Sequence, residues 1–387
     1  MKYLGVESEQ LHKLGGYHTA VEIAQQPEIW KKIWEMVQTT SPDIVQYLDE
    51  ALKHSKRIIL TGAGTSAFIG ITLKSLFQTK FGLITEAIPT TDLVTHPDHY
   101  FLRNTPTLLI SFARSGNSPE SAAAVVLANE CCDHVYHLII TCNIHGALAK
   151  VSSTQPMKVI FLPEESNDQS LAMTSSYTSM LLTGLLIARI HELPALADKL
   201  SNLCVCAQDF LDHNCHQLEE IAKLDFKRIV FLGSGPFFGA ATESSLKIQE
   251  LTDGEVISKF ETYLGFRHGP KSVIDSKTII VYFLSSQNEH ALKYELDLIN
   301  SMKMGTRPLL EIGISESSKD SLSIFQSYSF ASEKLVADDY LMAIAYVLFA
   351  QVLGFYKSIE LQLKPDSPSV NNDIARVVEG VHIYTLI

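Results

Sequence analysis

The stretch KRIILTGAG at Lys56–Gly64 decides the fold, because it recurs as KRIVFLGSG at Lys227–Gly235, 171 residues further on. Each copy is a short apolar run that ends in glycines, which is typical of a buried strand entering a helix. The same offset relates Thr107–Phe112 to Thr278–Phe283. Because several apolar runs share one offset, we infer an internal duplication.

The pattern between these runs predicts an α/β fold. A third pair of runs, Tyr136–Cys142 and Pro308–Ile314, is separated by nearly the same offset. Longer amphipathic stretches lie between the runs, as helices do when they cover both faces of a parallel sheet. We therefore expect two tandem domains, each a flavodoxin-like, three-layer arrangement of a mostly parallel sheet flanked by helices. The expected division is a helical segment at 1–44, a first domain at 45–190, connecting helices at 191–221, a second domain at 222–360 and a tail at 361–387.

Two prolines punctuate the helical stretch before the first domain. Pro27 suits the first turn of a helix, where a missing N–H leaves no bond unmade. Ser41 precedes Pro42 and is expected to cap a second helix, since proline interrupts a helix interior. The sequence therefore predicts a helix break at Ser41–Pro42.

The composition excludes some classes of partner. Of the 387 residues, 46% are hydrophobic and 19% are charged, as in globular domains. The net charge of −12, without a Lys/Arg cluster, argues against a nucleic-acid partner. We find no apolar leader and no run of about 18 apolar residues, so we expect no membrane partner and a cytoplasmic location. The six cysteines are then expected to be reduced thiols.

Two loops of the first domain are rich in small hydrogen-bond donors. Ligands bind at the carboxyl ends of strands in open α/β sheets, and helix N-termini there favour anions. We predict that the residues of these loops bind a phosphate group. They are, in chain order, Gly64, Thr65, Ser66, Arg114, Ser115, Asn117 and Ser118. The alternative is that their hydroxyl groups only cap helices.

The corresponding loops of the second domain have a different composition. Pro236 and Phe237 follow Gly235, where the first domain has Thr65 and Ser66. Ser285–Asn288 lacks the Ser-Gly-x-Ser arrangement of the first domain. The duplicated fold is therefore expected to keep one phosphate site, in its first half.

A second group of polar residues could move protons. Glu243, Lys247 and Glu250 share one face of a predicted helix, by their spacing of four and three residues. His268 follows on a turn between Arg267 and Gly269, and imidazole is a common general acid and base in enzymes. A carboxylate and a histidine are the minimum set for proton transfer on a sugar. The alternatives are a surface ion pair on the helix and a structural or surface histidine.

These motifs resemble those of a known family. Both halves resemble sugar isomerase (SIS) domains, and the second is similar to the isomerase half of glucosamine-6-phosphate synthase. In that enzyme a Glu-x₃-Lys-x₂-Glu helix is followed by a Lys-His-Gly-Pro motif. Here the corresponding stretches are Glu243–Glu250 and Arg267–Pro270.

The resemblance implies roles for individual residues. Glu250 would be the catalytic base that moves a proton between C1 and C2, with Glu243 and Lys247 in support. His268 would open the pyranose ring, and in the family it often reaches the site of a neighbouring subunit. Thr65, Ser66, Ser115 and Ser118 fall on phosphate-binding positions. Ala172 and Thr174 lie in Ser170–Ser175, which falls where family members contact the sugar.

One position departs from the synthase. Arg376 stands where the synthase has a lysine for ring opening. Because a guanidinium group stays protonated, Arg376 could bind a charge but would be a poor proton shuttle.

Over its whole length the chain resembles the AgaS group, including Gly16–Ala20 and Ser111–Ser121. This resemblance implies deamination and isomerisation of galactosamine 6-phosphate to tagatose 6-phosphate and ammonia. It implies a small-molecule sugar phosphate as the ligand and no cofactor. It also implies a homodimer or larger homo-oligomer with shared active sites.

Other functions are left open by the residues alone. A ketose/aldose isomerase that releases no ammonia would use the same base, and a non-catalytic phosphosugar sensor would use the same phosphate loops. Gly62, Gly64 and Ala67 with Glu86 form a weak dinucleotide-binding pattern. Cysteines and histidines between Cys204 and His216 fit no common zinc spacing, so no metal site is predicted.

Overall fold

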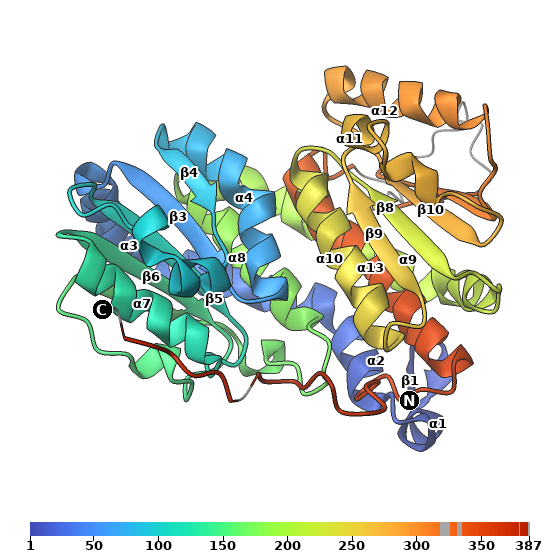
Figure 1. Ribbon diagram of the computed structural model, residues 1–387, viewed down its shortest axis with the longest axis horizontal. Coiled ribbons are helices and arrows are strands. Elements are labelled where there is room, and N and C mark those ends of the chain that lie inside the picture. The colour runs from blue at the N-terminus through green and yellow to red at the C-terminus, as the bar shows by residue number, and fades with distance from the viewer. Residues whose placement is uncertain (318–325, 331–334, 379, 386–387) are drawn as a thin grey trace. The chain divides into compact units, whose positions relative to one another are not determined.

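The computed structural model describes residues 1–317, 326–330, 335–378 and 380–385, which form two compact units (Figure 1). We call them the first-sheet unit and the second-sheet unit, after the repeat whose strands each contains. The first-sheet unit comprises Ile29–Asp168, Ser175–Leu193 and Ile374–Ile387. The second-sheet unit comprises Met1–Glu28, Gln169–Thr174 and Pro194–Asp373. The units are interleaved along the chain, and the boundaries drawn from the sequence stay predictions.

The first sheet has five parallel strands in the order β4-β3-β5-β6-β7. Numbered along the chain, this is the order 2-1-3-4-5 of flavodoxin-like folds. The strands are β3 (Arg57–Gly62), β4 (Ile84–Ala87), β5 (Thr107–Ala113), β6 (Val135–Thr141) and β7 (Met157–Phe161).

The second sheet repeats this topology. Its order is β12-β11-β10-β8-β9, again with every pair parallel. The strands are β8 (Arg228–Leu232), β9 (Ile257–Glu261), β10 (Thr278–Phe283), β11 (Leu310–Ser315) and β12 (Gln326–Ser329). Each strand predicted from the shared offset is present in both halves, in equivalent places of its sheet.

Helices cover both faces of the first sheet. On one face α4 (Thr65–Phe81) packs against α8 (Ser175–Ala188), and Gly70 lets α4 approach Leu60 closely. On the other face α5 (Thr90–Thr95), α6 (Pro97–Tyr100) and α7 (Pro119–Cys131) enclose a core that contains Ile59 and Leu109. Because neighbouring residues of a strand point to opposite faces, Leu60 packs against the layer that contains α4, and Ile59 packs against the layer on the other face.

The second sheet is covered in the same way. On one face α10 (Pro236–Leu251) packs against α13 (Asp339–Glu360), whose Tyr346 ring lies 5.5 Å from that of Phe283. On the other face α11 (Tyr263–Phe266) and α12 (Glu289–Met302) form a core with strand residues such as Ile280. The predicted fold class, two three-layer α/β domains, is confirmed.

The α13 helix is long and apolar enough to cross a membrane by length and composition alone. However, 94% of its most apolar window is buried, and this burial identifies it as a core helix. The helix α8 passes the same test only when it is taken together with α9 (Leu193–Ala222), and it is also buried throughout.

The N-terminal segment adds a short β1–β2 hairpin (Lys2–Tyr3 and Val6–Glu7) and the helices α1 (Ser8–Leu14), α2 (Tyr17–Ala24) and α3 (Gln26–His54). Single turns of 3-10 helix lie at Leu148–Lys150, Glu164–Ser166, Ile190–Glu192 and Pro270–Val273.

The helix α3 corrects one prediction. Pro27 lies in its first turn as expected, but the helix continues through Pro42, so the predicted break at Ser41–Pro42 is wrong. Pro42 has no N–H to donate to the carbonyl group of Gln38. The Ser41 hydroxyl donates to that carbonyl instead, at 2.8 Å, and thereby replaces the missing bond.

A buried histidine lies inside the first sheet. His137 of β6 is fully buried, and its Nε2 is 2.8 Å from Oδ1 of Asn129. Burial lowers the pKa of His137 to about 4, because a charged imidazole would lose its hydration.

This histidine should make stability depend on pH. Between the ordinary value of about 6.5 and the lowered one, the unfolded chain binds a proton that the folded chain does not. We therefore expect the free energy of unfolding to fall, by at most about 3 kcal/mol from this group, as pH drops from 6.5 to 4. Urea unfolding of His137→Leu should show a smaller loss over this range, whereas exposed His134→Leu should behave like the parent chain. Equal pH dependence in the parent and His137→Leu would contradict the assignment.

Candidate active site

The two predicted phosphate loops lie at one point of the first sheet. β3 and β5 are neighbours, and their pairing reaches Gly62 opposite Phe112. The chain leaves β3 through α4 toward one edge of the sheet, and leaves β5 through α7 toward the other edge. Loops that diverge in this way leave a crevice at the carboxyl ends of the strands, where open α/β sheets bind ligands.

The backbone fixes the first loop. A Cβ atom on Gly62 would lie 2.6 Å from the backbone of Ser66, so the strand end and the first turn of α4 touch only because residue 62 is glycine. Gly64 has φ 54° and ψ −129°, a conformation that side chains disfavour. α4 begins at Thr65, so Gly64, rather than either hydroxyl residue, takes the capping position.

The second loop also departs from simple helix capping. Ser118 stands immediately before α7, but its side chain makes no capping hydrogen bond. The Ser115 hydroxyl, which is buried, accepts the backbone N–H of Asn117 at 3.2 Å. Gly116 between them has φ 62°, which favours glycine. For Ser118 the helix-cap interpretation is therefore wrong.

A turn after β6, which was not predicted from the sequence, holds this second loop in place. Asn143 Nδ2 donates to the carbonyl group of Ser115 at 2.8 Å, and the N–H of Leu148 donates to that of Gly116 at 2.8 Å. A Cβ atom on Gly146 would lie 2.5 Å from the Ser115 carbonyl oxygen. The Asn and Gly at the end of the third apolar run were the available signal for a turn.

The predicted site residues Arg114 and Arg376 contact each other. The Arg114 guanidinium donates to the backbone carbonyl group of Arg376, and Arg114 is buried. Arg376 donates in turn to the carbonyl group of Asp168 at 2.7 Å and to Oδ1 of Asn167 at 2.9 Å. Both arginines therefore attach the tail to the first-sheet unit, in addition to any charge they offer a ligand.

Asp168 caps the helix α8. Its carboxylate accepts the backbone N–H groups of Ser175 at 3.1 Å and Ser176 at 2.9 Å. It also accepts the Ser176 hydroxyl at 2.5 Å. This cap was not predicted, because the aspartate lies seven residues before the helix.

The predicted sugar-contacting residues Ala172 and Thr174 are fully buried in the second-sheet unit. Their segment begins where Glu22 of α2 accepts the backbone N–H groups of Gln169 and Ser170 and the Ser170 hydroxyl. The carboxylate of Glu22 is itself buried. Glu22 is a positioning residue that was not predicted from the sequence, because its partners lie some 150 positions away along the chain.

The tail also bonds to the segment that contains Ala172 and Thr174. The N–H of Leu171 donates to the backbone carbonyl group of Asp366 at 3.0 Å. The Asp366 carboxylate accepts the Thr19 N–H and hydroxyl, each at 2.7 Å, and the N–H of His18 at 3.2 Å. Asp366 thus caps the first turn of α2. Gly16, which stands immediately before this helix, has no side chain to make such a bond.

The predicted proton-transfer residues on α10 are brought together. Lys247 is fully buried, with its Nζ 2.5 Å from Oε2 of Glu250 and 3.5 Å from Oε1 of Glu243. Glu243 is also fully buried, so the alternative of a surface ion pair is wrong. Glu250 keeps 22% of its side chain exposed, and of the three it is the one accessible to a ligand.

His268 lies on a separate, exposed turn. Its backbone N–H donates to the carbonyl group of Gly265 at 2.9 Å, and Gly269 beside it has φ 117°. No hydrogen bond or ion pair within the described part of the chain joins His268 to Glu250. The role of His268 stays a prediction.

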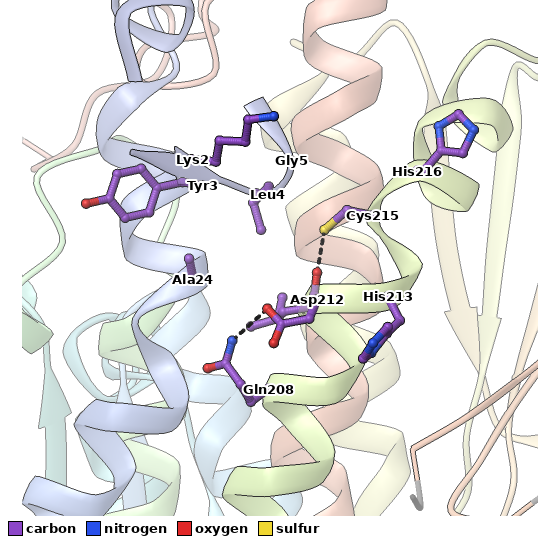
Figure 2. A pocket seen from close by; sticks show the side chains of 11 residues that line it. Lys2, Tyr3, Leu4, Gly5, Ala24, Gln208, Asp212, His213, Cys215 and His216 are labelled. Atoms are coloured by element: carbon purple, nitrogen blue, oxygen red, sulfur yellow. Dashed lines mark hydrogen bonds between the residues drawn. The ribbon is translucent and has the colours of Figure 1, made fainter. Parts of the chain in front are cut away.

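A cavity of about 460 Å³ in the second-sheet unit contains none of the predicted site residues (Figure 2). It lies between the β1–β2 hairpin, α2 and α9, where Gln208 donates to Asp212 at 2.9 Å. Cys215 there donates to the carbonyl group of Leu211, and burial raises the pKa of its thiol to about 12. Across the residues described, no three His, Cys, Asp or Glu side chains are grouped so as to hold a metal ion.

Comparison with known proteins gives one consistent result. The SIS domain family model matches residues 51–189. D-galactosamine-6-phosphate deaminase AgaS from Shewanella sp. (strain ANA-3) is 40% identical, and the similarity covers 99% of this chain and 95% of the relative.

Two solved structures are similar to this chain over nearly its full length. Tagatose-6-phosphate ketose/aldose isomerase from Escherichia coli has a TM-score of 0.87 and 34% identity, over 98% of both chains. A Clostridium novyi NT protein provisionally given the same name has a TM-score of 0.96 and 38% identity, over 100% of both chains.

Gly146→Ala should disturb the second loop through the backbone of Ser115. Relieving such a contact costs about 1–3 kcal/mol, so we expect inorganic phosphate to bind about 5- to 150-fold more weakly. His145→Ala, an exposed neighbour on the same turn, is the matched control. Isothermal titration of both variants with inorganic phosphate is the measurement, and undiminished affinity in Gly146→Ala would contradict the role of the turn.

Glu22→Gln should loosen the segment that begins at Gln169. An amide group accepts fewer hydrogen bonds than a carboxylate, and its NH₂ would face the N–H groups that Glu22 now accepts. We therefore expect the free energy of unfolding to fall by about 1–3 kcal/mol. Hydrogen exchange should become faster at Gln169 and Ser170. Exposed Glu35→Gln serves as the control, and unchanged exchange in Glu22→Gln would show that Glu22 does not hold the segment.

Proposed function

Because the chain belongs to the AgaS family of SIS-domain proteins, we propose that it converts galactosamine 6-phosphate to tagatose 6-phosphate and ammonia. The family places it among enzymes that isomerise or deaminate sugar phosphates. The observation that carries the proposal is full-length similarity to a relative named D-galactosamine-6-phosphate deaminase.

In this proposal the loops after β3 and β5 bind the phosphate group. Thr65 and Ser66 stand at the first positions of a long helix, whose N-terminus favours an anion. Ser115 and Ser118 add hydroxyl groups at the adjacent strand end. The chain is acidic overall, so local donors of this kind are needed to hold a dianion. Anchoring the distant phosphate orients the carbons that react.

Glu250 is the proposed base. It removes the proton from C2 of the open-chain amino aldose. The electron pair of that C–H bond forms the C1–C2 double bond of an enolamine, while the π pair of the C1 carbonyl moves to O1, which takes up a proton. Addition of a proton to C1 and loss of one from the nitrogen give a ketimine at C2. Water then adds to the ketimine and ammonia leaves, which yields the ketose. Lys247 balances the buried charge of Glu243 and fixes Glu250 by direct contact.

His268 and Arg376 have accessory roles in the proposal. His268 assists ring opening, and its exposed position on a turn leaves it available to the site of a second copy of the chain. We therefore include a homodimer or larger homo-oligomer in the proposal. Arg376, bonded to Asn167 and Asp168, positions the tail rather than carrying protons.

The ketose/aldose isomerase reaction is the second candidate, because the Escherichia coli structural relative carries that name. A coupled ammonia assay with galactosamine 6-phosphate, glucosamine 6-phosphate and their N-acetyl forms separates the two. Ammonia release from galactosamine 6-phosphate is expected. Interconversion of an aldose and a ketose phosphate without any ammonia release would favour the second candidate, and binding without turnover would favour a sensor.

Glu250→Gln should abolish turnover while phosphosugar binding persists. Loss of a general base reduces the rate by about 10²–10⁴-fold, and the phosphate loops remain intact. The measurements are ammonia release and titration with the sugar phosphate. Exposed Glu255→Gln, five residues further on, is the control, and normal turnover in Glu250→Gln would refute the assignment.

A further inference from the structure

The second sheet has a loop equivalent to the phosphate loop after β5. It follows β10 at the same divergence of neighbouring strands, between β8 and β10. The 171-residue offset aligns Ser286 with Ser115 and Asn288 with Asn117. The repeat therefore retains a loop with donors, although its sequence is altered.

This loop surrounds a carboxylate that belongs to the chain itself. Oδ1 of Asp339 accepts the backbone N–H groups of Ser286 at 3.1 Å and Gln287 at 3.3 Å. Oδ2 of Asp339 accepts the Ser285 hydroxyl, and the Ser286 hydroxyl lies 3.2 Å from Oδ1. Successive N–H groups and hydroxyls around one anion are the arrangement with which proteins bind phosphate.

Asp339 comes from the helix that matches α8 in the first sheet. α13 follows the last strand of its sheet and packs against α10, as α8 follows β7 and packs against α4. The first residue of α13 is Asp339, whereas the first residue of α8 is Ser175. The two helices thus begin with different residue types, a carboxylate on α13 and a hydroxyl on α8.

The helix does not need Asp339 for its own capping. Asp338 is the N-cap of α13, and its side chain accepts the N–H groups of Tyr340 and Leu341. The carboxylate of Asp339 reaches back to the loop after β10 instead.

Two more carboxylates stand behind the loop. The Ser286 hydroxyl lies 2.6 Å from Oε2 of Glu316, and the N–H of Ser285 donates to Oε2 of Glu295 at 2.9 Å. Glu316 and Glu295 are both buried. A second anion bound at this loop would be repelled by these carboxylates.

We propose that Asp339 occupies the anion site of the second repeat in place of a phosphate group. With Glu316 behind it, this internal carboxylate closes the site, so each chain binds one sugar phosphate, at the loops of the first repeat. The limit of one sugar phosphate per chain rests on the proposed function. The inference that the second site is closed rests only on the contacts of Asp339.

Equilibrium dialysis of the full chain with inorganic phosphate tests the proposal. Asp339→Ser introduces the residue that begins α8, and adding Glu316→Gln removes the charge behind the loop while keeping an acceptor for the N–H of Ala337. Both parent and doubly substituted chains are also measured with Ser115→Ala and Ser118→Ala, which disable the first site. Asp297→Ser with Glu289→Gln, exposed changes on α12, matches the loss of charge.

The expected stoichiometry rises from one phosphate per parent chain to two in Asp339→Ser/Glu316→Gln, and to one when the first site is also disabled. The α12 control should stay at one. An unchanged stoichiometry in the folded double variant would overturn the proposal. Failure of the parent to bind phosphate, with a gain in the double variant, would refute only the proposed first site.

Thermal unfolding provides the second measurement, for the case that the double variant is too unstable for dialysis. In the background lacking the first site, Asp339→Ser/Glu316→Gln should unfold at a lower temperature than its parent. Added phosphate should raise its midpoint and leave that of the parent in place, since a ligand stabilises only the state that binds it. No selective rise with phosphate would also overturn the proposal.

Discussion

The close contact between a strand end and the first turn of the following helix determines the rest of each half. A Cβ atom on Gly62 would lie 2.6 Å from Ser66, and one on Gly233 would lie 2.3 Å from Phe237. Gly64 and Gly235 then turn the chain with nearly the same dihedral angles, φ 54° and 58°. This contact directs both helix N-termini at the carboxyl edge of their sheets. One half presents hydroxyl residues there and the other begins its helix with proline.

The features that the sequence predicted correctly are local ones. The apolar runs and the glycines after them are set by a few neighbouring residues, so the shared offset located equivalent strands in both sheets. The spacing of Glu243, Lys247 and Glu250 likewise placed them on one helix face. Their burial could not be predicted, because it depends on α13 packing over α10.

The features that the sequence missed depend on partners far along the chain. Pro42 was expected to end a helix, yet the hydroxyl of the preceding serine satisfies the carbonyl group it leaves. Glu22 acquires its role from Gln169 and Ser170, and Asp339 from Ser285 and Ser286. The spacing of apolar residues does not reveal such pairs, because each of these two residues alone resembles an ordinary carboxylate on a helix.

The capping of α2 by Asp366 has a consequence for biosynthesis. The carboxylate that bonds Thr19 is made 347 residues after it. Domains ordinarily fold in the order of their synthesis. Here α2 must wait for the synthesis of Asp366 before that carboxylate can satisfy its N-terminus. The second-sheet unit therefore cannot complete these contacts until Asp366 has been made, long after the strands of the first sheet, which all precede residue 162.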